Sequence, residues 1–426
     1  MSKDNLRFET KQLHVGQEIT DPTGARAVPI YQTAAYVFDN CDHAAARFGL
    51  SDAGNIYGRL TNPTEDVFEQ RMAALEGGVA ALAVASGAAA VTYAIESITR
   101  SGDHIVAAKQ IYGGTYNLLA HTLTNYGVNT TFVDSDDPEN FKLALQENTK
   151  AIFIESLGNP NSSLVDVESV SKIAHEHGIP LIIDNTFGTP YLIRPIEYGA
   201  DIVVHSTSKY MDGHAVQVGG VIIDSGNFDW TNGKFPEFTE PDESYHGIVY
   251  TQSYGKLAYI VKARMQLMRD FGCYPAANSA FLLNLGLETL AVRMKQYCEN
   301  AKIVADYLEA SDKVLSVNYP GLKSNKYYEL AQKYLPDGCS GVITFSIKGG
   351  RDNAVKFMDS LKLASNVVHV ADIRTCVLHP ASATHRQLTD EQLAAAGIDG
   401  GMIRFSCGLE NIDDIIEDIA QALEKI

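Results

Sequence analysis

The sequence lacks several features that would assign it to common classes of protein. Its 34 lysines and arginines are outnumbered by 52 acidic residues, which gives a formal charge of -18. Nucleic acids and anionic membranes attract the opposite charge, so neither is an expected partner, although a local positive site can still bind a small anion. The most apolar stretch, residues 79–98, contains Ser86, Gly87, Glu96 and Ser97. It falls short of the roughly 20 consecutive apolar residues that a membrane helix needs.

Cysteine is sparse, and its spacing shows no C-x-x-C pair. The six cysteines therefore predict reduced thiols in a cytoplasmic protein. The N-terminal segment MSKDNLRFETKQLHVG is too polar for a secretory signal. We expect no metal site, because His175 and His177 diverge on a predicted helix while His379 and His385 have no matching acidic or cysteine cluster.

Chain length and pattern predict more than one domain. Residues 1–60 show little periodicity and are predicted to be an irregular arm that a neighbouring subunit orders. Residues 61–266 are predicted to be an α/β domain, and residues 267–426 a smaller α+β domain. An insertion at 225–247 is expected to form a loop, since it is too polar and interrupted for regular structure.

Short runs of β-branched residues at 150–155, 179–183 and 201–205 are typical of buried parallel strands. Residues 167–177 lie between the first two, have apolar residues at helical spacing and stop at Gly178, the predicted C-cap. Strand–helix–strand repeats of this kind predict a mostly parallel, doubly wound sheet.

The later part of the chain is predicted to contain helices at 259–271 and 279–308 and a strand at 341–347. A final helix is predicted to begin at Asn411, an N-cap residue type. Its apolar face would comprise Ile412, Ile415, Ile416, Ile419 and Leu423.

Candidate functional residues follow the predicted strands, because ligands of open α/β sheets bind beyond the carboxyl ends of the strands. Asn159, Asp184 and Lys209 stand at those ends. Asp184 and Lys209 would face the same crevice. A structural ion pair is one interpretation of them, and a catalytic pair is the other.

Two neighbouring features favour a catalytic site. Two hydroxyls, Ser206 and Ser208, precede Lys209, and the turn Ala85–Ala89 precedes a helical run whose first backbone N–H groups form an anion site. A phosphate cradle, a buried lysine and a strand-end aspartate together predict a pocket for pyridoxal 5'-phosphate (PLP). Each of these features alone would be weak evidence.

Each role in such a pocket has a physical requirement. Lys209 forms the imine with the cofactor, which requires burial to lower the pKa of its amine. Asp184 pairs with the pyridine nitrogen and keeps it protonated. Tyr112 stacks on the ring or, alternatively, packs in the core. The phosphate is held by Ser206, Ser208 and the backbone amides of Gly87 and Ala88.

Five segments together resemble the Cys/Met-metabolism PLP enzymes, the cystathionine γ-synthase-like group of fold type I. These are Asn55-Ile-Tyr-Gly-Arg-Leu-Thr-Asn-Pro-Thr64, Ser86-Gly87, Ile182-Ile-Asp-Asn-Thr186, His205-Ser-Thr-Ser-Lys209 and His379-Pro-Ala-Ser-Ala-Thr-His385. The resemblance implies a PLP-dependent transferase, with residues 61–266 as the PLP-binding domain. It also implies a catalytic dimer, normally paired into a tetramer.

The resemblance assigns further roles. Tyr57 and Arg59 are implied to bind the phosphate in the neighbouring subunit, and Asn159 to lie near the cofactor and substrate. Arg404 is implied to hold the substrate carboxylate through its guanidinium fork, with Arg374 as the less favoured candidate.

Within the group, Phe228–Phe238 and Tyr245-His-Gly247 resemble the O-acetylhomoserine sulfhydrylases. This implies a γ-replacement in which sulfide or methanethiol displaces acetate. Cystathionine γ-synthase and methionine or cystathionine lyase are alternatives on the same scaffold, and a non-catalytic PLP-binding protein is an alternative of another class. Gly114, where methionine γ-lyases usually carry cysteine, weighs against a lyase. Departures from the pattern are Ala88 (often Met), Ser208 (usually Thr) and His369 (often Asn or Ser).

Overall fold

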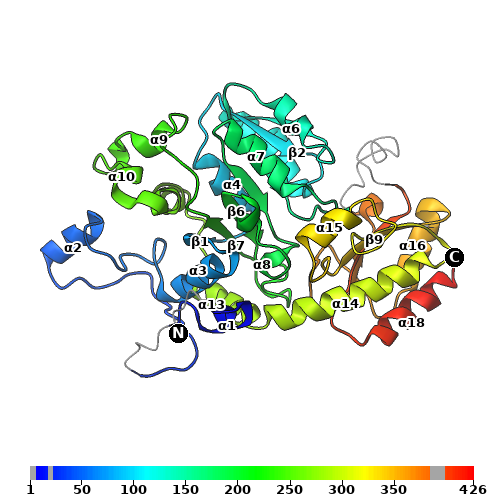
Figure 1. Ribbon diagram of the computed structural model, residues 1–426. Coiled ribbons are helices and arrows are strands. Elements are labelled where there is room, and N and C mark those ends of the chain that lie inside the picture. The colour runs from blue at the N-terminus through cyan, green and yellow to red at the C-terminus, as the bar shows by residue number, and fades with distance from the viewer. Residues whose placement is uncertain (1–5, 18–22, 384–398) are drawn as a thin grey trace.

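The computed structural model describes residues 6–17, 23–383 and 399–426, and it contains two β-sheets (Figure 1). Thr384 and His385, the end of one quoted motif, lie outside the described residues. Residues 79–98 supply a strand and a helix of the large sheet layer. Across the described ranges, no helix combines the length and the apolar character that crossing a membrane requires.

The large sheet is mostly parallel, as predicted. Its strand order is β1-β7-β6-β5-β4-β2-β3, and only β7 runs antiparallel to its neighbours. The strands are β1 (Ala80–Val84), β2 (His104–Ala108), β3 (Asn129–Val133), β4 (Thr149–Glu155), β5 (Leu181–Asp184), β6 (Ile202–Ser206) and β7 (Gly220–Asp224). The predicted strands at 150–155, 179–183 and 201–205 are thus confirmed as β4, β5 and β6.

The aliphatic runs form strands because helices cover the sheet and exclude water from it. Ile152, Phe153 and Ile154 on β4 are completely buried. α3 (Pro63–Glu76) packs against β1, α4 (Gly87–Glu96) against β6 and β7, and α7 (Val167–Glu176) against β5. Burial on both sides explains the continuous rather than alternating apolar pattern of the parallel strands.

Local signals set the bounds of several helices. At the start of α3, the Asn62 side chain accepts a hydrogen bond from the Thr64 backbone N–H, and Pro63 follows at the first helical position. Gly77 ends the same helix with a φ of 84°. The other helices of this part of the chain are α5 (Gly113–Asn117), α6 (Glu139–Ala144), α8 (Thr189–Leu192), α10 (Tyr250–Tyr254), α11 (Ala258–Lys262) and α12 (Arg269–Phe271).

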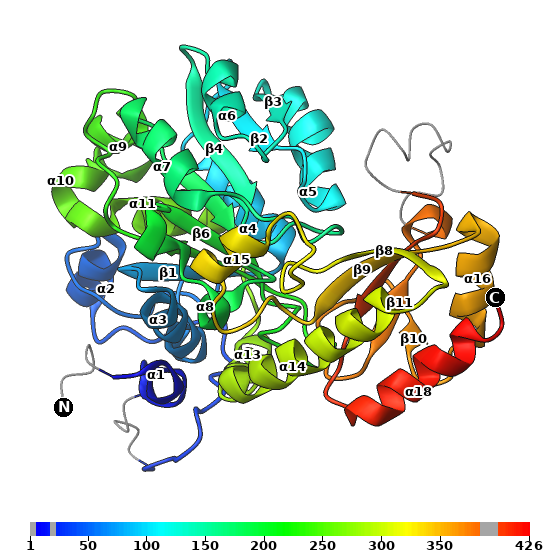
Figure 2. The same ribbon diagram turned by 45° about the vertical axis from the view of Figure 1, so that its right-hand side comes forward.

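A smaller α+β unit follows, as predicted (Figure 2). Its strand order is β10-β11-β12-β9-β8, formed by β8 (Val314–Asn318), β9 (Val342–Ile347), β10 (Ser365–Asn366), β11 (Cys376–Leu378) and β12 (Met402–Ser406). The helices of this part of the chain are α13 (Ala277–Leu287), which packs against α3 of the large unit, α14 (Leu290–Glu309), α15 (Tyr328–Tyr334), α16 (Gly350–Ser360) and α18 (Ile412–Leu423). The long α14 runs beneath both sheets (Figure 1). Asn411 caps α18, and Ile415, Ile419 and Leu423 are buried, which confirms the predicted final helix.

The prediction of an irregular arm was wrong in part. Residues 1–60 contain α1 (Phe8–His14) and α2 (Cys41–Phe48). α1 packs against α3 and α14, and buried Gln12 donates to the Glu288 carbonyl, so tertiary contacts stabilise a helix too short to persist alone. The arm with α2 extends away from the small sheet (Figure 1).

The insertion at 225–247 also differs from the prediction, since it contains α9 (Pro236–Thr239) and a 3-10 turn at Glu243–Tyr245. Aromatic packing orders it: the Trp230 ring stacks on Tyr259 at a centroid distance of 5.2 Å, and Phe235 and Phe238 are completely buried. Two predicted helices are interrupted as well. The helix at 259–271 passes through a π-helical turn at Ala263–Met268, and the one at 279–308 breaks between α13 and α14.

Candidate active site

Residues from both sheets converge at one place. Lys209 follows β6, and its Nζ lies 3.5 Å from Nδ1 of His369, which belongs to the segment between β10 and β11. Arg404 on β12 donates from Nη1 to Oδ1 of Asn159, which follows β4, at 3.3 Å. The structure thus brings together Lys209, Asn159 and Arg404, although they are far apart in the sequence.

The Lys209 amine lies in an environment that favours its neutral form. Burial, and secondarily the positive charge of Arg404, lowers its pKa from 10.5 to about 8. An amine with this pKa is available as a nucleophile and base near neutral pH, which a solvent-exposed lysine is not. A lowered pKa is what imine formation by Lys209 requires.

Asp184 lies at the end of β5 and is anchored by Thr186. The Thr186 backbone N–H donates to Asp184 Oδ1 at 2.9 Å, and the Thr186 hydroxyl donates to the same oxygen. Within the described residues no group donates to the second oxygen of Asp184, so that oxygen can accept a bond from a ligand. Burial raises the pKa of Asp184, while the Thr186 hydrogen bonds and nearby His205 oppose the rise.

Glu155, which sequence reasoning missed, lies beside Asp184. It is 5% exposed; its Oε1 accepts the Tyr112 backbone N–H at 2.6 Å and its Oε2 accepts the Asn159 backbone N–H at 3.0 Å. Burial and the charge of Asp184 raise the pKa of Glu155 well above its ordinary value. An acidic residue at the end of a buried strand was the signal that could have identified it. Glu155 holds two of the predicted site residues, Tyr112 and Asn159, by their backbones.

The predicted anion cradle has free backbone donors. Ser86 Oγ accepts the Ala89 N–H, and the Ser86 carbonyl accepts the Ala90 N–H. The N–H groups of Gly87 and Ala88, at the start of α4, have no acceptor among the described residues.

The position of the cradle also explains its glycine. A Cβ at position 87 would lie 2.6 Å from the Ser206 Cβ, so only glycine permits this approach of α4 to the end of β6. The Ser208 hydroxyl, in contrast, already accepts the Gly219 N–H at 3.0 Å, so it stabilises the loop that contains Gly219 in addition to contacting any ligand.

The two candidate arginines have different surroundings. Arg404 is 7% exposed, and its Nη2 donates to the Val368 carbonyl at 2.9 Å. Arg374 has a side chain that is 65% exposed and paired with Asp372. The geometry favours Arg404 over Arg374 as the group that meets a carboxylate beside Lys209.

Tyr57 and Arg59 lie elsewhere in the chain. The Arg59 guanidinium packs 5.6 Å from the centre of the Tyr57 ring and donates to the Arg269 carbonyl. No hydrogen bond or ion pair connects either residue with Lys209 or Asp184 within the part of the chain that the structure describes. A cavity of about 150 Å³ adjoins both residues and is also lined by Tyr31, Asn62 and Tyr274.

Comparison with known proteins gives the family. The family described as Cys/Met metabolism PLP-dependent enzyme matches residues 9–424. The chain belongs to this family.

Similar proteins support the assignment over the full length. The homocysteine synthase of Schizosaccharomyces pombe is 49% identical over all of both chains, and the O-acetyl-L-homoserine sulfhydrylase of Leptospira meyeri is 49% identical over 99% of this chain and 98% of its own. The crystal structure of a putative O-acetylhomoserine (thiol)-lyase from Campylobacter jejuni, which contains a pyridoxyl-lysine phosphate, superposes with a TM-score of 0.95. It is 41% identical and covers 98% of this chain and 100% of that one. The fold is therefore that of fold type I PLP enzymes.

PLP dependence agrees with the chemistry of the residues present. The cofactor has an aldehyde, a pyridine nitrogen and a phosphate, and the site provides an amine of lowered pKa, a half-buried carboxylate with an open oxygen, and two unpaired amides at a helix start. These are the three kinds of group that the cofactor family requires.

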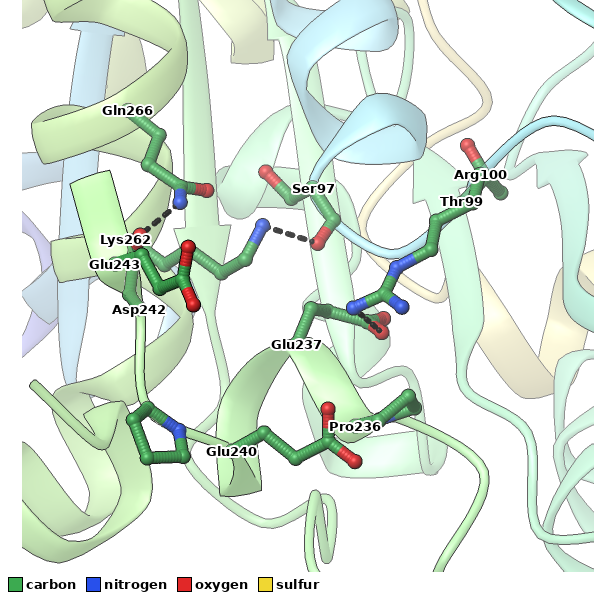
Figure 3. A pocket seen from close by; sticks show the side chains of 11 residues that line it. Ser97, Thr99, Arg100, Pro236, Glu237, Glu240, Asp242, Glu243, Lys262 and Gln266 are labelled. Atoms are coloured by element: carbon green, nitrogen blue, oxygen red, sulfur yellow. Dashed lines mark hydrogen bonds and ion pairs between the residues drawn. The ribbon is translucent and has the colours of Figure 1, made fainter. Parts of the chain in front are cut away.

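A cavity of about 290 Å³ elsewhere is not part of this site (Figure 3). It lies between the end of α4 and the insertion, and two of its cationic side chains are paired: Lys262 Nζ donates to the Ser97 carbonyl at 2.9 Å, and Arg100 meets Glu237 at 3.5 Å. The Arg100–Glu237 pair attaches the insertion to the segment after α4.

Proposed function

We propose that the chain catalyses γ-replacement on O-acetyl-L-homoserine, in which hydrosulfide or methanethiol displaces acetate to give L-homocysteine or L-methionine. The observation that carries the proposal is the convergence of Lys209, Asn159 and Arg404 at the edge of the sheet where the half-buried Asp184 ends β5. The names of the full-length relatives support the choice of reaction.

The chain's own residues would divide the work as follows. Lys209 holds PLP covalently through Nζ, Asp184 pairs with its ring nitrogen, and the Gly87 and Ala88 amides with Ser206 and Ser208 meet the phosphate. When bound, PLP draws electrons from the substrate carbon that bears the amino group. Once Lys209 is free, its amine takes the proton from that carbon and moves protons at the next one. Tyr112 would stack on the cofactor ring.

Arg404 would bind the substrate α-carboxylate, with Asn159 beside it. Two N–H groups of a guanidinium match two carboxylate oxygens, which orients the substrate relative to the Lys209 amine. The Asn159 Oδ1 contact already fixes the direction of the Arg404 fork. The three residues thus determine which bond at the substrate carbon faces the base.

We also propose a catalytic dimer, assembled into a tetramer, in which Tyr57 and Arg59 complete the phosphate site of the partner. Their separation from the Lys209 group within one chain and the extended arm support this arrangement (Figure 1). All six cysteines are free, which supports a cytoplasmic location.

The test is product analysis with the purified protein. With O-acetyl-L-homoserine and sulfide we expect homocysteine and acetate in equal amounts, and no 2-oxo acid or ammonia when sulfide is omitted. Release of 2-oxo acid without sulfide would instead establish a lyase, and cystathionine formed from added cysteine would establish a synthase. Parallel assays with succinyl and phospho esters identify the leaving group. Borohydride reduction with peptide mapping is expected to place PLP on Lys209.

A further inference from the structure

His369 contacts two basic residues of the site, Lys209 and Arg404. Its Nδ1 is 3.5 Å from Lys209 Nζ, and its backbone carbonyl accepts a hydrogen bond from Arg404 Nη2 at 3.4 Å. Cys376 Sγ also donates to that carbonyl, at 3.5 Å. The backbone of residue 369 is therefore held while its ring faces the reacting amine.

The charged form of Lys209 selects one tautomer of the ring. A lysine ammonium can only donate N–H, so Nδ1 facing it accepts and Nε2 carries the hydrogen, and we assign the same tautomer opposite the neutral amine. Nε2 is buried and has no partner among the described residues. The only protein group that the imidazole meets through a ring nitrogen, within the described chain, is Lys209.

The surrounding charges keep the ring neutral. Burial, and next the positive charge of Lys209, lowers the pKa of His369 below its ordinary 6.5. Arg404 acts in the same direction, whereas Asp372 and Asp212 oppose it. The imidazole therefore remains an acceptor over the pH range in which Lys209 becomes a neutral amine.

We propose, on the basis of the function above, that His369 is a positioning residue that holds one N–H of the free Lys209 amine at Nδ1 and so directs the nitrogen lone pair at the substrate. A neutral amine has two N–H groups and one lone pair, and fixing one N–H restricts where the lone pair points. The proton then passes from the substrate carbon to Lys209 without any change in oxidation state.

Protonation of His369 reverses this arrangement. The imidazolium presents an N–H at Nδ1, which binds the Lys209 lone pair that would otherwise accept the substrate proton. The same charge repels any protonated Lys209. Activity is therefore expected to fall on the acid side as His369 takes up a proton, below pH 6.5.

The experiment compares wild type, His369→Asn and His369→Ala, with His121→Asn as a control at an exposed histidine outside the site. Asn offers an amide oxygen near the place of Nδ1 but does not titrate, whereas Ala offers nothing. At pH 8 we expect H369A to lose about ten- to a hundredfold in kcat with KM nearly unchanged. We expect H369N to stay within about threefold of wild type.

The pH profile separates positioning from mere packing. From pH 8 down to 5.5, wild type and H121N should lose activity through an ionisation that H369N lacks, so H369N should keep a larger share of its pH 8 activity. An identical acid limb in wild type and H369N, or full kcat in H369A, would overturn the proposal. Equal thermal unfolding and PLP content across the variants are required for the comparison.

A second measurement does not depend on the reaction. In the full-length protein freed of PLP, competitive acetylation of Lys209 followed by mass spectrometry reports the pKa of its amine. Loss of the acceptor in H369A should lower that pKa by about half a pH unit, and H369N should restore it. An unchanged pKa would contradict the contact. If wild type makes no homocysteine, the proposed function fails, while this labelling still decides the role of His369.

Discussion

Glu155 at the end of β4 is the direct register partner of Asp184 at the end of β5. Register partners on neighbouring parallel strands point to the same face, so the buried carboxyl group of Glu155 lies next to the half-buried one of Asp184. Burial raises the pKa of both groups. Two hydrogen bonds from Thr186 and the charge of His205 oppose the rise for Asp184, whereas the charge of Asp184 raises the pKa of Glu155 further. Two backbone N–H groups, of Tyr112 and Asn159, oppose the rise in the pKa of Glu155, so each carboxyl group is held by hydrogen bonds from the loops beside it.

Replacing Glu155 by Gln tests this arrangement. Gln has one side-chain acceptor where Glu155 has two, so either the Tyr112 or the Asn159 backbone N–H loses its partner. We expect kcat/KM to fall about tenfold, the effect of one buried hydrogen bond of roughly 1–1.5 kcal/mol. Glu139→Gln, on the exposed face of α6, should behave as wild type. Wild-type kinetics and unchanged visible circular dichroism of bound PLP in E155Q would exclude a positioning role for Glu155.

The two arginines give a matched pair of substitutions. Arg404→Lys keeps the charge but loses the fork that binds both carboxylate oxygens, so kcat/KM for O-acetyl-L-homoserine should fall about a hundredfold, roughly 3 kcal/mol. Arg374→Lys should change it less than about twofold, because an exposed ion pair contributes little. Steady-state kinetics of both variants is the measurement. An equal loss in both, or a larger one in R374K, would mean that the carboxylate binds elsewhere.

Lys209 should also affect stability in a pH-dependent way. Its folded pKa of about 8 lies below the ordinary 10.5, so between these values the unfolded chain binds more protons and folded stability rises with pH. Below pH 8 the folded protein bears the whole free-energy cost of burying the Lys209 charge. In PLP-free protein, Lys209→Met should therefore raise the free energy of unfolding by about 2 kcal/mol at pH 7 and by progressively less toward pH 10.5. Urea unfolding at several pH values measures this.

Lys256→Met, at an exposed position, is the control and should show no such trend. A Lys209→Met effect that stays constant from pH 7 to 10.5 would show that the gain comes from packing and not from the removed charge.

The parts of the site that depend on the local pattern of residues could be predicted from the sequence. Runs such as 150–155 and 201–205 are continuous and apolar because their strands are buried on both faces, and the residues after parallel strands meet at one edge. The strand pattern alone therefore places Lys209, Asp184 and Asn159 at a common edge of the sheet. The start of α18 at Asn411 follows from capping chemistry in the same way.

Contacts between distant segments could not be predicted from the local pattern of residues. His369 and Lys209 are separated by 160 positions, and Arg404 and Asn159 by 245, so no periodicity connects them. Glu155 appeared to be the polar end of a strand, and its two acceptor contacts depend on how the loops after β2 and β4 return to it. The insertion was predicted to be a loop because its composition is polar and interrupted. The packing of Trp230 on Tyr259 that orders it depends on a tertiary neighbour, which local pattern does not show.

The arm's role in a neighbouring subunit can be decided by mixing two inactive variants. Lys209→Ala lacks the proposed base, and Arg59→Ala lacks the proposed phosphate contact. If Arg59 serves the partner, a mixed dimer has one site with both defects and one site with none. Random reassociation of equal amounts should then restore about a quarter of wild-type activity, since half the dimers are mixed and each has one intact site of two. If Arg59 served its own subunit, every site in the mixture would carry one defect. Activity should then stay at the level of the separate variants, which would place the arm on its own chain.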